Sequence, residues 1–115
     1  MSEDKQSAAT AAFKRRFERV ALPQNAEVYA DEDGRRLGRV TSLGQGGMLV
    51  ETTRNFMFQS PHRIILVEEN EGVHREIVAV ALYRHDGSVG FEFPSLDVDA
   101  AVEIGVILGR YYQKK

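Results

Sequence analysis

The strongest constraint on the fold is a series of short apolar segments, separated by tight-turn signals, between residues 26 and 93. Two of the separators contain an Asp-Gly pair, at 33–34 and 86–87, which favours a two-residue hairpin turn when strands flank it. Six short strands at roughly even spacing are typical of a small antiparallel barrel or sandwich. Because closure removes exposed sheet edges, we expect a mainly β fold with a six-stranded antiparallel β-barrel.

The expected strands span 26–30, 35–43, 48–52, 63–68, 73–84 and 88–93. The fifth strand is apolar on both faces, which is typical of a central or strongly curled strand. In the sixth, Val89, Phe91 and Phe93 alternate with polar or small residues, so one face of this strand is apolar.

A C-terminal α-helix is expected over 97–112. Pro94 stops the last strand, and Ser95 or Asp97 can cap the helix. Two neighbouring apolar stripes are expected to pack on the barrel: Val98, Val102, Gly105, Val106 and Gly109 in one, and Ile104, Leu108 and Tyr111 in the other. We interpret the spacing of the two glycines as close packing of the helix on the sheet.

Length and composition indicate one globular domain of 115 residues with a formal net charge of −2. We expect residues 1–12 to be a flexible N-terminal tail and 13–115 to be the barrel domain with its terminal helix. No apolar run approaches 18 residues and no secretory signal is recognisable, so we expect a cytoplasmic protein without membrane insertion. A pI near 5.9 argues against a nucleic-acid polymer as partner.

Nothing in the sequence indicates an enzyme, a metal site or a cofactor. The histidines His62, His74 and His85 lack metal-ligand spacing. No Gly-x-Ser-x-Gly nucleophile motif is present, and the cysteine count is zero. The acids at 31–33 and 68–71 lie in expected turns, where carboxylates are usually solvated.

A basic cluster stands out at 13–20 (FKRRFERV), and its cations are Lys14, Arg15, Arg16 and Arg19. Arg15 and Arg19 are four residues apart, so they share one side of either a helix or a strand. A guanidinium fork fits a phosphate, or the O6/N7 edge of guanine, through two parallel hydrogen bonds. The cluster is local and therefore suits a compact anionic ligand, although a solvated basic segment is the alternative interpretation.

Several segments together resemble the PilZ family over residues 13–112. Residues 14–20 (KRRFERV) are similar to its N-terminal Arg-x-x-x-Arg motif, with Arg15 and Arg19 as the pair. Residues 38–48 (GRVTSLGQGGM) resemble the strand end and turn that carry its second motif. Residues 88–93 (SVGFEF) resemble its final strand, which a closing helix follows.

This resemblance implies a six-stranded barrel with a C-terminal helix and the binding of cyclic di-GMP, a bacterial second messenger. The implied ligand-binding residues are Lys14, Arg15, Arg16, Arg19, Ser42, Gly44, Gly46 and Gly47. The family's second motif reads Asp or Asn, then x-Ser-x-x-Gly. Here Ser42 and Gly44 occupy its first and third positions, so only the final glycine, Gly47, is kept.

Two hypotheses follow from the resemblance. In the first, the chain is a single-domain receptor that binds cyclic di-GMP and relays the signal to an unidentified protein effector. In the second, it is an adaptor that binds proteins without nucleotide, for example in type IV pilus assembly or motility. The adaptor surface would be the loop at 56–58 (FMF) or the helix end with Tyr111 and Tyr112. For the loop we favour a plug that closes one end of the barrel.

Overall fold

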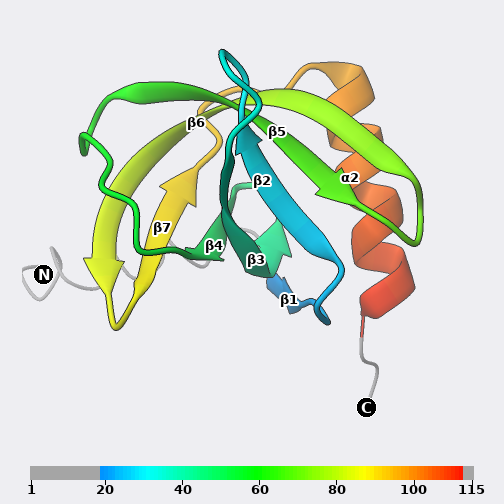
Figure 1. The fold of residues 1–115 in the computed structure, drawn as a ribbon. Coiled ribbons are helices and arrows are strands. Elements are labelled where there is room, and N and C mark those ends of the chain that lie inside the picture. Colours follow the sequence, from blue (N-terminus) through cyan, green and yellow to red (C-terminus); the bar gives the residue numbers. More distant parts are fainter. Residues whose placement is uncertain (1–18, 113–115) are drawn as a thin grey trace, which may run out of the picture.

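The structure is a computed structural model that describes residues 19–112, and they form a β-barrel with a helix against its side (Figure 1). Its elements are β1 (Arg19–Ala21), β2 (Ala26–Ala30), β3 (Arg36–Gly44), β4 (Gly47–Glu51), β5 (Pro61–Glu68), β6 (Val73–His85), β7 (Ser88–Glu92) and α2 (Val98–Tyr111). The tail expected at 1–12 lies outside the described residues, as does the last part of the terminal segment, 113–115.

Six of the strands close into a barrel in the order β3-β2-β5-β6-β7-β4, and pairing of β4 with β3 completes the circle. Every pairing is antiparallel. The six-stranded antiparallel barrel with a C-terminal helix is therefore confirmed. One strand was not expected from the sequence: β1 adds three residues to the edge of β3. It is too short for an alternating pattern to reveal it.

The Asp-Gly pair at 86–87 forms the two-residue hairpin turn that the sequence predicts, whereas the pair at 33–34 lies in a longer loop between β2 and β3. Asp86 and Gly87 both have positive φ, 49° and 78°, as a type I′ hairpin turn requires. Gly34 also has a positive φ, 69°, and its N–H donates to the carbonyl of Ala30 at 2.9 Å. These turns fix the register of the β2–β3 and β6–β7 hairpins.

Alternating apolar residues of the strands fill the barrel. The largest fully buried apolar side chains in the described part of the chain are Val28, Val40, Leu43, Met48, Val50, Ile64, Leu66, Val89, Ile104 and Ile107. In the β4–β5 loop, Phe56 packs edge-on against the buried Phe91, with ring centroids 5.1 Å apart. Met57 and Phe58 are exposed, so the plug expected at 56–58 consists of Phe56 alone.

The helix begins where the sequence predicts, but it turns a different face to the barrel. The Asp97 carboxylate, not Ser95, caps it by accepting the N–H of Ala100 at 2.8 Å. Ala100, Ile104 and Ile107 are its buried residues, and Leu108 and Tyr111 are partly buried beside them. The expected packing of the second stripe is confirmed.

Apart from Gly105, which lies beside Gln45 of the barrel, the other stripe does not pack on the barrel, and that part of the prediction was wrong. Its three valines, Val98, Val102 and Val106, are exposed. A Cβ added to Gly109 would have no atom within 4 Å, so this glycine does not serve close packing on the sheet. The two apolar stripes adjoin each other on the helix, and periodicity alone does not say which part of so wide an arc is buried.

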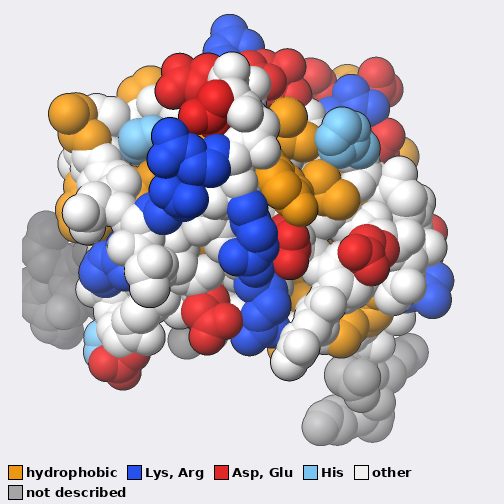
Figure 2. All heavy atoms as spheres, in the orientation of Figure 1, with side chains coloured by type: hydrophobic (Ala, Val, Ile, Leu, Met, Phe, Trp, Pro, Cys, Tyr) orange, Lys and Arg blue, Asp and Glu red, His pale blue; other side chains and the backbone are white. Residues whose placement is uncertain are grey.

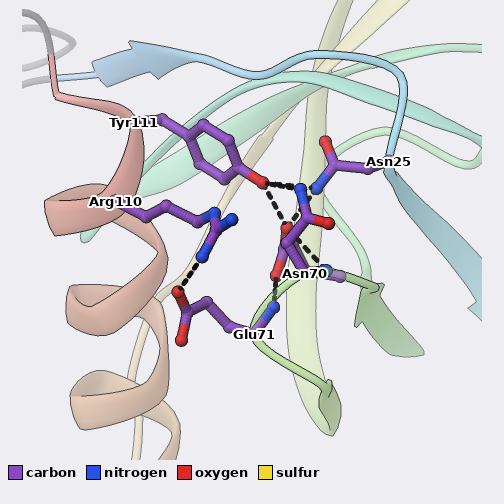
Figure 3. Close-up of polar contacts among 6 residues, drawn as sticks. Asn25, Asn70, Glu71, Arg110 and Tyr111 are labelled. Carbon is purple, nitrogen blue, oxygen red and sulfur yellow. Dashed lines mark hydrogen bonds and ion pairs between the residues drawn. The ribbon is translucent and has the colours of Figure 1, made fainter.

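A buried carboxylate anchors the C-terminal end of the helix to the barrel (Figure 3). Glu68 is fully buried and accepts the Tyr111 O–H at 2.7 Å. It also accepts the side-chain amide of Asn25 and the backbone N–H groups of Asn70 and Glu71. The side-chain amides of Asn25 and Asn70 in turn donate to the Tyr111 oxygen. The tyrosine hydroxyl therefore makes all three of its possible hydrogen bonds.

The burial of Glu68 corrects the expectation that the acids at 68–71 are solvated. Glu68 follows Ile64 and Leu66 on the inward side of β5, because side chains alternate along a strand. Only the acids that follow it belong to the turn.

Two ion pairs hold the sides of the helix. Arg75 on β6 binds Glu103 through both guanidinium N–H groups, at 3.0 and 2.9 Å, and the hydrogen bond lowers the pKa of the Glu103 carboxyl. Arg110 reaches Glu71 at 2.8 Å, and this hydrogen bond raises the pKa of the Arg110 guanidinium. Both pairs are partly exposed and orient the helix more than they stabilise it.

Tyr111→Phe should destabilise the fold by about 1–3 kcal/mol, because it removes the hydrogen bond donated to the buried carboxylate of Glu68 and the acceptor of two side-chain amides. The measurement is urea unfolding followed by circular dichroism. Tyr112→Phe is the matched control: the neighbouring tyrosine is exposed and should leave the midpoint unchanged. Equal midpoints for the two variants would contradict an anchoring role for the hydroxyl.

Candidate functional site

The short strand β1 lies beside the end of β3 and places Arg19 next to the Gly-rich turn (Figure 1). The register pairs Arg19 with Gly44 and Ala21 with Ser42. Val20, between the two β1 residues, is buried in the barrel, so Arg19 and Ala21 face outward. Directly opposed residues in an antiparallel pair have Cα atoms about 4.5–5.5 Å apart. Arg19, Ser42 and Gly44 therefore share one small patch on the same side of the β1–β3 pair, in which Arg19 is exposed, Ser42 half-buried and Gly44 buried.

The absence of a side chain at Gly44 matters for the shape of this patch. Gly44 directly opposes Arg19, and cross-strand neighbours on one face normally contact each other through their side chains. Gly44 brings no side chain to this patch, and its backbone is buried, so the polar groups of the patch come from Arg19 and Ser42. Ser42, two residues earlier and half-buried, offers one hydroxyl on the same face.

Gly47, the one residue of the second motif that is kept, has a structural reason to be glycine. A Cβ at this position would lie 2.2 Å from the carbonyl oxygen of Phe91, because β4 passes close to β7 here. The carbonyl of Gly46 accepts the N–H of Phe93 at 2.9 Å, on the way from β7 to the helix. Gly47 is therefore needed for barrel closure, and its presence does not by itself indicate a ligand.

Gln45, which was not among the predicted site residues, connects the turn to the helix. Its side-chain amide donates to the carbonyl of Ala101 in α2 at 3.1 Å. A Cβ at Gly105 would lie 3.4 Å from the same nitrogen, an ordinary van der Waals distance, so the glutamine lies directly beside this glycine. The sequence signal was the single long polar side chain within an otherwise glycine-rich turn, 44–47.

The structure brings five of the predicted site residues to one region of the barrel: Arg19, Ser42, Gly44, Gly46 and Gly47. The other three, Lys14, Arg15 and Arg16, lie outside the described residues. The pairing of Arg15 with Arg19 therefore stays a prediction.

A larger groove, of about 1390 Å³, lies elsewhere, between the β2–β3 hairpin and the β4–β5 loop. Figure 2 shows arginine side chains in a band down this face, below a group of acidic ones. Most of these arginines are already neutralised: Arg36 pairs with Glu27, Arg39 with Glu51 and Arg35 with Asp33, at 3.0–3.1 Å. The hydrogen bond from Arg36 lowers the pKa of the Glu27 carboxyl. An anion would have to displace these carboxylates, so the groove is the weaker candidate.

Two negative findings apply to residues 19–112. No group of three or more His, Asp or Glu side chains in this range could hold a metal ion. No helix within it has the length and apolar character needed to span a bilayer.

Searches of family models and of curated proteins gave no match. Solved structures do match. YcgR from Escherichia coli, crystallised in complex with c-di-GMP, aligns over 84% of this chain and 45% of its own, with a TM-score of 0.70 and 16% identity. The chain thus spans less than half of that YcgR chain.

Two isolated domains align over almost their whole length. The PilZ domain of Escherichia coli YcgR with c-di-GMP aligns over 85% of this chain and 91% of its own, with a TM-score of 0.66 and 19% identity. The PilZ domain of CeSA, from a cellulose-synthesizing bacterium, aligns over 84% of this chain and 99% of its own, with a TM-score of 0.64 and 13% identity. The chain therefore has the PilZ-domain fold.

Gly47→Ala should destabilise the protein by roughly 1–3 kcal/mol, because the added methyl group overlaps the Phe91 carbonyl and forces β4 and β7 apart. Chemical denaturation measures this. Gly109→Ala is the control: its methyl group meets nothing within 4 Å, and it should stabilise the helix by about 0.5–1 kcal/mol. A Gly47→Ala protein as stable as the wild type would show that β4 can shift without cost.

Proposed function

We propose that the protein is a receptor for cyclic di-GMP, which binds on the outside of the barrel where β1 lies beside the end of β3. The observation that carries the proposal is the pairing of the exposed Arg19 with Gly44, at the Gly-rich turn of a barrel with the PilZ-domain fold. Two of the structural neighbours reported above were solved with c-di-GMP.

The chemistry of Arg19 supports this assignment. Its side chain is exposed, and among the described residues no carboxylate pairs with it. A guanidinium without a partner offers its five donors to a phosphate or to the guanine edge. A second arginine, Arg15, would double the positive charge presented to a ligand that carries two phosphates.

The altered second motif should weaken binding without abolishing it. Ser42 replaces a carboxylate or amide, and Gly44 replaces a hydroxyl. Each lost polar contact costs roughly 1–3 kcal/mol if its partner on the ligand stays unpaired. Together the two losses correspond to about 30- to 10⁴-fold weaker binding, so we expect an affinity in the micromolar range.

The turn that faces the ligand also contacts the helix, and this supports a relay to a protein effector. Gln45 hydrogen-bonds to the backbone of α2, and Gly46 hydrogen-bonds to the segment that leads into it. A ligand that reorganises the turn would change either the position of the helix or the hydrogen bond that holds it. The effector would then recognise the helix and the ligand-covered face of the barrel.

Arg19→Ala should reduce affinity for cyclic di-GMP at least about 30-fold, because it removes a charge-assisted contact worth roughly 2 kcal/mol or more. Calorimetric titration of the full chain measures this. Arg63→Ala is the control: Arg63 lies on β5, is well exposed and pairs with Glu76, so its loss should leave the affinity unchanged. No binding heat from folded wild-type protein at high concentration would contradict the receptor and favour the nucleotide-free adaptor.

Ser42→Asp should tighten binding of cyclic di-GMP by about 3- to 10-fold, because a carboxylate accepts the donors of the guanine edge more strongly than a hydroxyl does. Ser42→Ala should change affinity in the opposite direction, by a smaller factor. The same titration compares both variants. If Ser42→Asp binds no better than the wild type, residues 42–47 do not face the base.

A further inference from the structure

The side of α2 that faces away from the barrel is apolar. Val98, Val102 and Val106 are 76%, 58% and 47% exposed, and they lie opposite the buried Ala100 and Ile107. Gly109 continues the same side, since it lies three and seven residues after Val106 and Val102. We call these four residues the outer face of α2.

This composition is unfavourable for an isolated helix in water. Valine restricts its χ1 rotamers in a helix, and glycine lowers helix stability by about 1 kcal/mol relative to alanine. Gly109 has no positive φ and no neighbour within 4 Å that requires the absence of a Cβ. Neither the fold nor the proposed nucleotide site uses the outer face, and aligned exposed valines typically mark an interaction surface.

We infer that the outer face is a homodimer interface, in which α2 packs antiparallel against α2 of a second copy. An antiparallel pair with a twofold axis near residue 104 sets Val102 against Val106 of the copy. The same register sets Val98 against Gly109 of the copy, so the side chain of one fills the gap left by the other. Small residues at such a crossing allow the two backbones to approach.

The charges at the edge of the outer face favour the same arrangement. Asp99 and Arg110 lie on one side of it, at opposite ends of the helix. In the antiparallel pair, Asp99 of each copy comes beside Arg110 of the other, whereas a parallel pair would keep Asp99 of one copy at the opposite end from Arg110 of the other. Asp99 has no ion pair among the described residues. Arg110, bound to Glu71, is 46% exposed and can donate to a second carboxylate.

The size of the face predicts a weak dimer. A helix of 14 residues is about 21 Å long. One such contact buries less than the roughly 800 Å² per partner of a stable complex, so we expect a dissociation constant on the order of 10⁻⁴ M. Self-complementarity of both shape and charge is what favours a second copy over a different protein.

Sedimentation equilibrium of the full chain without nucleotide, from about 10 µM to 1 mM, tests the proposal. The wild type should change from monomer to mostly dimer over this range. Val102→Glu should weaken the dimer at least about 30-fold, because it sets a charge into the apolar contact. Met57→Glu is the control: it adds the same charge at an exposed apolar residue on the β4–β5 loop and should dimerise like the wild type.

Two further variants test the charge pairing and the independence of the dimer from the nucleotide site. Asp99→Lys should weaken the dimer about 3- to 10-fold at low salt, because it repels Arg110 of the copy. Arg19→Ala should dimerise normally, so failure of the nucleotide proposal does not affect this one. A wild type that stays monomeric at 1 mM overturns the proposal. So does a dimer that persists in Val102→Glu, because its interface would lie elsewhere.

Discussion

The barrel depends on the close approach of β4 to its two neighbours, which two glycines make possible. A Cβ at Gly38 would lie 2.4 Å from the carbonyl oxygen of Glu51, and one at Gly47 would lie 2.2 Å from that of Phe91. Backbones this close leave no room for side chains between them, so β3, β4 and β7 can hydrogen-bond into a closed sheet. The strand β1 pairs with the end of β3 next to this closure, and that pairing places the candidate site.

Because the barrel itself requires Gly47, the motif glycine and the motif arginine differ in what they indicate about a ligand. Gly47 must be glycine for the barrel to close, whether or not a ligand binds, so its presence says little about nucleotide binding. Arg19 is different. It is exposed, makes no ion pair within the described chain and contributes nothing obvious to the core. An exposed cation beside the Gly-rich turn, which the barrel does not use for its own packing, is the stronger indication of an anionic partner.

Much of the fold could be predicted because its signals are local. The alternation along β7 and the Asp-Gly pair at 86–87 each specify backbone geometry within a few residues. The features that were predicted wrongly or missed depend on contacts between residues far apart in the sequence. Burial of Glu68 follows from the inward register of β5, yet its partner Tyr111 is 43 residues away. Long-range contacts of this kind also decide which side of α2 faces the barrel. The strand β1 has only three residues, too few for an alternating apolar pattern to be recognised.

The helix connects the two proposals physically, although each is tested alone. Its inner side lies against β1 and β3, the strands that carry the candidate site, and Gln45 and Tyr111 fix it near its two ends. A helix held at both ends moves as a unit, because bending it would break backbone hydrogen bonds. If nucleotide displaced Gln45, the outer valines would move with the whole helix. Dimerisation and nucleotide binding would then be thermodynamically linked, and each would change the affinity of the other by the same factor.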